Sequence, residues 1–127
     1  MAGKILIIED DLDLSDILAR LLNNAGYDTS RAETSMQGIS KALAERPDLI
    51  LTDLHLPDMI AVQAIVALKN DANTSAIPVI VLTAEQDREW KHKAIKAGAV
   101  EYLIKPISLP DLLHLVATFC RPLVSEF

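Results

Sequence analysis

The sequence predicts an α/β domain in which a parallel sheet of five strands is covered by helices on both faces. Short apolar runs alternate with amphipathic helical segments along the chain, repeating a strand and a helix five times. Such strict alternation favours parallel strands joined by right-handed helical crossovers. Three of the five strand segments are almost uninterrupted apolar runs, which is typical of strands buried on both faces.

Composition and charge limit the classes of protein to which the chain can belong. The 127 residues are 50% hydrophobic and 24% charged, which is ordinary for one globular domain. The net charge of −6 disfavours direct binding to nucleic acid, because a phosphate backbone attracts a basic face. No apolar run approaches the length of a membrane span, and the N-terminus lacks the pattern of a secretion signal. Cys120 is the one cysteine, so we expect no intrachain disulfide and a cytoplasmic location.

The first strand is predicted at residues 5–8, a continuous apolar run. A helix follows, with Asp11 or Asp13 as its N-cap and Gly26 closing its C-terminal end. Apolar side chains repeat along this segment at helical spacing, which indicates one buried face. The predicted face consists of Leu14, Ile17, Leu18, Leu21, Leu22 and Ala25.

The second strand is predicted at residues 27–31 and is poor in apolar side chains. Thr34 and Gln37 match a capping box for the second helix, which should end before Pro47. The predicted buried side of this helix consists of Met36, Ile39, Ala42 and Leu43.

The third strand, at residues 49–53, delivers Asp53 to its C-terminal end, and Pro57 prevents the strand from continuing. The third helix should bury Ala61, Ile65 and Leu68, with Val62 and Val66 broadening the apolar face.

The last two units follow the same plan. We predict a strand at residues 79–83, a helix at about 87–97 that stops at Gly98, and a strand at 102–104. Ser108 with Asp111 should cap the last helix, which Pro122 should stop. The buried face of this helix is predicted to consist of Leu109, Leu112, Leu113, Val116 and Cys120.

The polarity of the strands predicts their order in the sheet. The apolar first, third and fourth strands should be central, while the polar second strand and the short fifth strand should form the two edges. The order 2-1-3-4-5 satisfies this, which is the flavodoxin-like doubly wound (βα)5 arrangement with a topological switch between strands 1 and 3. We expect a single domain over residues 1–127, with the fold at about 3–121 and a tail at 122–127.

Chemically active side chains stand at the C-terminal ends of four strands. Glu9 and Asp10 follow the first strand, Asp53 ends the third, Thr83 ends the fourth and Lys105 follows the fifth. Parallel strands bring these ends to one rim, where open α/β sheets bind ligands. Three clustered carboxylates repel one another unless a cation joins them, and such hard oxygen ligands suit Mg²⁺. A hydroxyl and an ammonium beside them suit phosphoryl transfer, with a carboxylate as nucleophile.

Five motifs lie at these positions: residues 7–11 (IIEDD), 48–57 (DLILTDLHLP), 81–84 (VLTA), 97–99 (AGA) and 102–106 (YLIKP). Each motif is weak alone, but their order and their places at strand ends make the set specific. Through them the sequence resembles the response-regulator receiver domains of two-component signalling, including the chemotaxis regulators. The resemblance covers essentially the whole chain.

The resemblance implies a phosphorylation-switched signalling receiver with a defined acceptor and metal site. Asp53 would be the phosphoacceptor, taking a phosphoryl group in a phosphorelay from the phosphohistidine of a histidine kinase or a histidine phosphotransfer protein. The product would be an aspartyl phosphate. The Mg²⁺ ligands would be Glu9 (through a water), Asp10, Asp53 and the backbone carbonyl of His55.

The remaining implied roles concern catalysis and switching. Thr83 would hydrogen-bond the phosphoryl group, and Lys105 would pair with it, next to a cis peptide bond to Pro106. Tyr102 would be the aromatic switch, moving inward as Thr83 is pulled toward the phosphoryl group. The resemblance implies no organic cofactor.

The readout is predicted on the face made by the fourth helix, the fifth strand and the last helix. This face would control a downstream protein or an output domain, and a homodimer through it is possible. We expect no direct contact with nucleic acid or a membrane, and no enzymatic turnover beyond self-phosphorylation and self-dephosphorylation. A stand-alone regulator and a domain of a longer protein both remain open. Trp90 of the fourth helix is either partly buried or binds a partner. The basic surface of this helix is either simply solvated or docks an acidic partner, and it consists of Arg88, Lys91, Lys93 and Lys96.

Two other functions compete with this interpretation. A dehalogenase-like phosphatase also uses a strand-end aspartate, but it would need a second aspartate where this chain has His55. A receiver-like interaction module that is never phosphorylated would not need Asp10, Asp53, Thr83 and Lys105 together. The rings of His55, His92 and His114 are predicted to face solvent. The chain departs from the family at residues 60–61, where Ile-Ala replaces the usual Asp-Gly, and alanine disfavours the positive φ that glycine tolerates.

Overall fold

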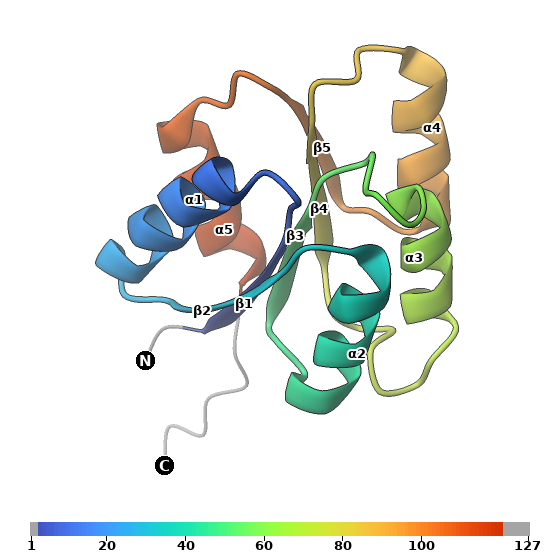
Figure 1. The fold of residues 1–127 in the computed structure, drawn as a ribbon, viewed down its shortest axis with the longest axis horizontal. Helices are drawn as coiled ribbons and strands as arrows, with labels where there is room; N and C mark the ends of the chain where they lie inside the picture. The colour runs from blue at the N-terminus through green and yellow to red at the C-terminus, as the bar shows by residue number, and fades with distance from the viewer. Residues whose placement is uncertain (1–2, 121–127) are drawn as a thin grey trace.

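The structure, a computed structural model, describes residues 3–120 of the chain (Figure 1). Strands and helices alternate throughout, as the apolar pattern predicts. The strands are β1 (Lys4–Ile8), β2 (Asp28–Ala32), β3 (Leu49–Thr52), β4 (Val79–Thr83) and β5 (Glu101–Ile104). The helices are α1 (Leu12–Asn24), α2 (Ser35–Glu45), α3 (Ala61–Lys69), α4 (Arg88–Ala97) and α5 (Leu109–Phe119).

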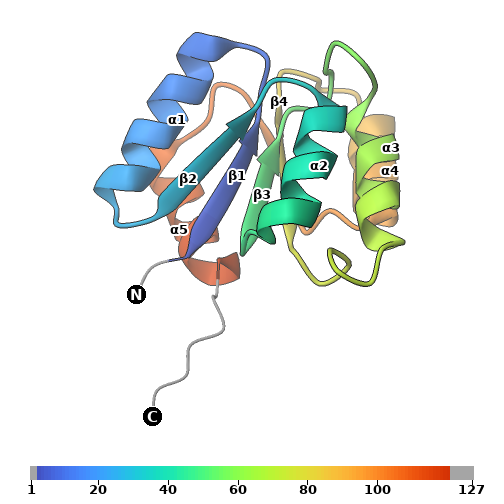
Figure 2. The same cartoon turned by 60° about the horizontal axis from the view of Figure 1, so that its bottom comes forward.

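The five strands form one parallel sheet in the order β2-β1-β3-β4-β5, which confirms the predicted topology. Helices α1 and α5 cover one face, and α2, α3 and α4 cover the other (Figure 2). Ile8 at the end of β1 pairs with Thr52 at the end of β3. This register places the residues that follow the two strands side by side.

The sheet separates two apolar cores. Alternate residues of β1 enter opposite cores: Leu6 and Ile8 face α2, α3 and α4, whereas Ile5 and Ile7 face α1 and α5. Successive side chains of a strand point to opposite faces, so a strand buried on both sides must be apolar at every position. The continuous apolar runs of β1, β3 and β4 follow from this requirement.

The prediction of the buried face of α1 is wrong at two positions. Ile17 is 55% exposed, and Ala25 is exposed as well. Ser15 and Ala19 lie on the buried face instead, together with the predicted Leu18 and Leu22. Small side chains let the helix backbone lie close to the sheet, so the buried stripe is rotated away from the face that hydrophobicity alone selects.

Helix α2 shows the same effect more strongly. Met36 and Leu43, both predicted to be buried, are 56% and 39% exposed. Ala42 is buried and Ile39 packs against the core, as predicted, and the unpredicted Ser35 and Gly38 complete the buried face. A Cβ atom at Gly38 would lie 2.8 Å from Cγ1 of Ile8, so glycine is needed for this close approach.

Two other predicted core residues lie at the surface. Val66 of α3 is 44% exposed and Leu109 at the start of α5 is 42% exposed. Pro122, predicted to stop the last helix, lies outside the described residues. No helix within residues 3–120 combines the length and the apolar character needed to cross a membrane.

The predicted N-terminal caps of α1, α2 and α5 are confirmed, and Asp87, for which no cap was predicted, caps α4. Side-chain oxygens of Asp11, Thr34, Asp87 and Ser108 accept hydrogen bonds from backbone N–H groups in the first turns of α1, α2, α4 and α5. Gly98 ends α4 with a φ of 127°, a conformation that costs glycine little. Helix α3 alone among the five starts without a side-chain cap.

Candidate functional site

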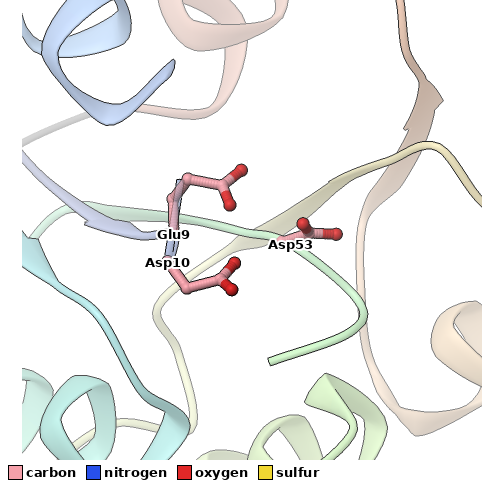
Figure 3. A group of neighbouring side chains, drawn as sticks. All are labelled: Glu9, Asp10 and Asp53. Atoms are coloured by element: carbon pink, nitrogen blue, oxygen red, sulfur yellow. The ribbon is translucent and has the colours of Figure 1, made fainter. Parts of the chain in front are cut away.

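The carboxylates predicted to meet at the rim of the sheet lie together in the structure. Glu9 and Asp10 follow β1, and Asp53 follows β3; one carboxylate oxygen from each lies within 4.8 Å of the others. Their side chains point toward a shared space at the end of the sheet (Figure 3). The backbone N–H of Asp53 donates to the carbonyl of Ile8 at 3.0 Å, so pairing of β1 with β3 continues to the acidic residue itself.

Lys105, which directly follows β5, brings a positive charge into this cluster. Its Nζ lies 3.0 Å from Oε1 of Glu9 and 3.3 Å from Oδ2 of Asp53. Because Glu9 is only 3% exposed, burial raises the pKa of its carboxyl, although the hydrogen bond from Lys105 opposes that rise. Burial alone would lower the pKa of Lys105, but the hydrogen bond and charge of Glu9, with the charge of Asp53, raise it. Lys105 therefore stays protonated and neutralises part of the acidic cluster.

The Asp53 carboxylate is held by the backbone that follows it. Oδ1 accepts a hydrogen bond of 2.6 Å from the N–H of Leu54, whose side chain is fully buried. The hydroxyl of Thr52 donates to the carbonyl of Asp53 at 2.9 Å. Oδ1 is therefore fixed by the main chain, while Oδ2 lies on the Lys105 side of the site.

The three acidic residues after β1 have different surroundings. Asp11 caps α1, accepting from the N–H groups of Asp13 and Leu14, and its own N–H donates to Oε2 of Glu9 at 3.2 Å. Asp10 is exposed and points toward Asp53 (Figure 3). The sequence run of acids therefore divides into a helix cap and two site residues.

Thr83 and Tyr102 meet through Glu85, a residue that sequence reasoning did not select. The hydroxyl of Thr83, which is 1% exposed, accepts from the N–H of Glu85 at 3.1 Å. The Tyr102 hydroxyl donates to the carbonyl of Glu85, also at 3.1 Å. Tyr102 is only 6% exposed, so its ring already lies inward here. Glu85 stands in a loop without periodicity, and nothing in the sequence distinguishes it.

The sequence predicts that the ring of His55 faces solvent, but in the structure the ring also contacts other side chains. Its Nε2 lies 3.1 Å from Oε1 of Glu85, although the side chain is 51% exposed. The imidazole also packs edge-on against Trp90, with ring centroids 6.0 Å apart. The Nζ of Lys93 lies over the Trp90 ring, 4.6 Å from the ring centroid. His55 thus links the loop after Asp53 to α4. The other two histidines, His92 and His114, are exposed as predicted.

The loop between β3 and α3 accommodates the Ile60-Ala61 pair without strained backbone. Among the described residues, Arg46 is the one non-glycine residue with a positive φ, so Ala61 adopts ordinary helical geometry. The N–H of Ala61 donates to the carbonyl of Leu54 at 2.8 Å, and His55 pairs with Ile60 in an antiparallel bridge. The loop is therefore closed at its base. The peptide bond between Lys105 and Pro106 is cis, as expected.

The donor set at the rim suits a small, hard divalent cation. Glu9, Asp10 and Asp53 offer only carboxylate oxygens, and Mg²⁺ is bound in proteins by one or two carboxylates with the remaining positions filled by water. Three protein carboxylates are too few for a closed calcium site of six to eight oxygens. The cluster therefore fits the magnesium site of a receiver domain.

Comparisons with known proteins point to one family. The profile of the response regulator receiver domain matches residues 5–117. The DNA-binding dual master transcriptional regulator RpaA of a Synechocystis species is 36% identical over 118 residues, which are 93% of this chain and 49% of RpaA. Protein PilH of Pseudomonas aeruginosa is 34% identical over 114 residues, which are 90% of this chain and 94% of PilH.

One of the similar solved structures contains a magnesium ion. The receiver domain of the sensor histidine kinase PA1611 from Pseudomonas aeruginosa, with a magnesium ion coordinated in its active-site cleft, has a TM-score of 0.86 and 25% identity, covering 94% of this chain and 98% of its own. This chain spans about half the length of the first curated relatives that it matches, 49% of RpaA and 50% of the phosphate regulon regulator PhoB from Pseudomonas aeruginosa. From the match over residues 5–117, the sheet order and the acidic rim, the chain belongs to the family of response regulator receiver domains.

Proposed function

We propose that the chain is a signalling receiver that is switched by phosphorylation of Asp53. The observation that carries the proposal is the position of this carboxylate, 3.3 Å from the ammonium of Lys105 and beside Glu9 and Asp10. Asp53 combines a nucleophilic oxygen, a cationic neighbour and two further carboxylates for a metal. We also propose that residues 1–127 carry this one receiver domain, and that the protein acts in the cytoplasm, where its cysteine stays reduced.

The proposed reaction moves one phosphoryl group from a phosphohistidine donor to this carboxylate. An oxygen of Asp53 attacks phosphorus, the bond from phosphorus to the imidazole nitrogen breaks, and that nitrogen leaves with its electron pair and takes up a proton from solvent. The chain contributes mainly position and charge, as phosphoryl transfer requires. Lys105 moves from its contact with Asp53 to pair with the transferred group, and the hydroxyl of Thr83 exchanges the N–H of Glu85 for a phosphoryl oxygen.

Glu9, Asp10, Asp53 and the backbone carbonyl of His55 would hold the metal. When bound, Mg²⁺ would supply Lewis-acid stabilisation of the charge on the transferred phosphoryl oxygens. The residues of the chain determine where that charge lies, because the N–H of Leu54 fixes one oxygen of Asp53. The reaction takes place only on the chain itself, so it is a self-modification and not turnover of a separate substrate.

The readout face proposed for the phosphorylated state is formed by α4, β5 and α5. Exposed apolar side chains on α4, on β5 and in the turn between them would suit contact with a downstream protein, an output domain or a second copy of the chain. Those side chains are Ile95, Val100 and Ile104. The basic side chains of α4 favour an acidic partner surface, and they stand out on a chain of net charge −6. The donor would be a histidine kinase or a histidine phosphotransfer protein.

The two competing functions are less well supported. In a dehalogenase-like phosphatase a second aspartate would act near the leaving group, but here His55 stands at that position with its Nε2 engaged by Glu85. In an interaction module that is never phosphorylated, the buried Glu9 and the converging Lys105 would have no purpose that an apolar pair could not serve at lower desolvation cost.

Incubation with acetyl phosphate and MgCl₂ tests the proposed acceptor. Intact-protein mass spectrometry should detect one added phosphoryl group on the wild type and none on Asp53→Asn. Asp28→Asn is the matched control, because Asp28 is exposed at the start of β2 and loses the same charge. Undiminished phosphorylation of Asp53→Asn would contradict the assignment, and steady release of phosphate from a phosphomonoester would favour the phosphatase.

A further inference from the structure

Asp58 connects the loop after the proposed phosphoacceptor to the N-terminus of α2. Its Oδ1 accepts a hydrogen bond of 2.8 Å from the N–H of Ser35, and its Oδ2 accepts one of 2.9 Å from the N–H of Met36. The loop and the helix are 23 and 22 positions apart at these contacts. The carboxylate therefore caps a helix that belongs to a different part of the chain.

The helix depends on this distant cap. The first N–H groups of an α-helix have no partner inside the helix. In α2, Thr34 accepts from Gln37, which leaves the N–H groups of Ser35 and Met36 for Asp58. Ser35 is fully buried, so water does not easily replace the carboxylate there. The first turn of α2 contains no acidic residue of its own, and Asp58 supplies the negative charge that a helix N-terminus favours.

The charge state of the Asp58 side chain agrees with this geometry. Desolvation raises the pKa of its carboxyl, but the N–H groups of Met36 and Ser35 outweigh that effect, so the pKa lies below its ordinary value. Asp58 is thus a carboxylate at neutral pH and can accept both hydrogen bonds at once.

The same loop carries His55, which lies two positions after Asp53 and whose backbone carbonyl is a proposed metal ligand. At its base, the loop is closed by the Ala61 to Leu54 hydrogen bond and by the bridge between His55 and Ile60. Helix α3, which the loop enters, starts without a side-chain cap. Asp58 ties the loop to α2 by two hydrogen bonds, whereas the His55 side chain ties it to Glu85, on the α4 side.

We propose that Asp58 is a positioning residue for the metal site, holding the loop on α2 so that the His55 carbonyl stays beside Asp53. The inference rests on the proposed function, in which that carbonyl is a metal ligand. Side chains that orient metal ligands without touching the metal affect metal affinity strongly. Coupling between two sites is reciprocal, so binding of Mg²⁺ also stabilises the Asp58 cap on α2.

Magnesium titrations of four proteins test this role well below their melting temperatures. Asp58→Ala should bind Mg²⁺ about tenfold more weakly than the wild type, at the lower end of the effect of such outer partners on metal affinity. Asp58→Asn retains one oxygen acceptor and should lie between the two. Asp28→Ala removes an equal charge at the opposite end of the sheet and should bind as the wild type does.

Hydrogen exchange gives a second readout that does not require the Asp58 variants to fold, because it is measured on the wild type. In the wild type, saturating MgCl₂ should slow amide exchange at Ser35 and Met36, and that protection should be absent in Asp10→Ala. A helix cap with no link to the metal site would lower the melting temperature of Asp58→Ala but leave its Mg²⁺ dissociation constant and the wild-type exchange unchanged. That result would overturn the role of Asp58. A wild type that binds no Mg²⁺ would overturn the proposed metal site itself.

Discussion

Lys105 donates a hydrogen bond of 3.0 Å to Glu9, across 96 positions of sequence, and so places its ammonium inside a cluster of three carboxylates. The glutamate is almost fully buried and the lysine side chain is 23% exposed. A buried carboxylate without a partner is costly. The lysine thus stabilises the acidic rim through its own charge, and the same ammonium is the group proposed to meet the incoming phosphoryl group.

Replacing Lys105 with methionine should destabilise the fold and tighten metal binding. The loss of unfolding free energy at pH 7 should be about 1–3 kcal/mol, below the roughly 3–5 kcal/mol for breaking a fully buried pair, because the lysine is partly exposed. The uncompensated carboxylates should then attract Mg²⁺ more strongly, so the gain in melting temperature with MgCl₂ should exceed that of the wild type. Urea denaturation and thermal melts measure both effects, with Lys91→Met, at an exposed position on α4, as control. Equal stability of the two variants would contradict the pairing.

Magnesium should stabilise the wild type through the acidic rim. Binding to the native state alone raises stability by about 2.7 kcal/mol when the ligand is present at one hundred times its dissociation constant. Asp10→Ala removes the exposed carboxylate of the cluster and should lose most of this gain. Thermal melts with MgCl₂, against CaCl₂ for selectivity, measure the effect. A wild-type melting temperature that does not respond to millimolar MgCl₂ would exclude the site.

Phosphorylation should be read out beyond the pocket through Glu85. Drawing the hydroxyl of Thr83 toward a phosphoryl group breaks its hydrogen bond from the Glu85 N–H, and the Glu85 carbonyl holds Tyr102. Amide chemical shifts with and without beryllofluoride should therefore change between Thr83 and Tyr102 and into α5. A coupling of about 1–3 kcal/mol, typical of allosteric linkage, is sufficient. Shifts confined to the loops around Asp10 and Asp53 would place the readout elsewhere.

Cys120 should react slowly with thiol reagents while the protein is folded. Burial, with the nearby charge of Asp48, raises the pKa of its thiol to about 11. Because the folded state holds the proton more tightly than the unfolded state, the free energy of unfolding should fall as pH rises from about 9 toward 11, and not below that range. Rates of iodoacetamide labelling with and without urea measure the first effect, and melts of Cys120→Ala the second. Fast labelling of the native protein at pH 8 would contradict it.

The rim could be predicted because strand ends are readable in the sequence. Continuous apolar runs end abruptly at Glu9, Asp53 and Thr83, and strict alternation makes all the strands parallel. Parallel strands bring their ends together whatever the details of packing. The topology and the meeting of Glu9, Asp10 and Asp53 are therefore confirmed, and the chemical roles of these residues stay predictions.

The buried faces of the helices were predicted less accurately than the strand ends. Hydrophobicity alone does not determine which residues of a helix lie closest to the sheet. Met36 and Leu43 of α2 are far more apolar than Gly38, but Gly38 is the residue that lies against Ile8, and the two larger side chains are exposed. On α1, Ser15 and Ala19 displace Ile17 from the core in the same way. The choice depends on the shape of the opposing sheet, which no single segment contains.

The sequence by itself determined the order of elements, the parallel sheet and the acids at its rim, because these follow from local periodicity and from where apolar runs stop. Tertiary structure alone decided that Lys105 would bridge Glu9 and Asp53, that Glu85 would join Thr83 to Tyr102, and that Asp58 would cap α2. These contacts join loops without periodicity, and their partners are brought within hydrogen-bonding distance only by packing of the helices on the sheet.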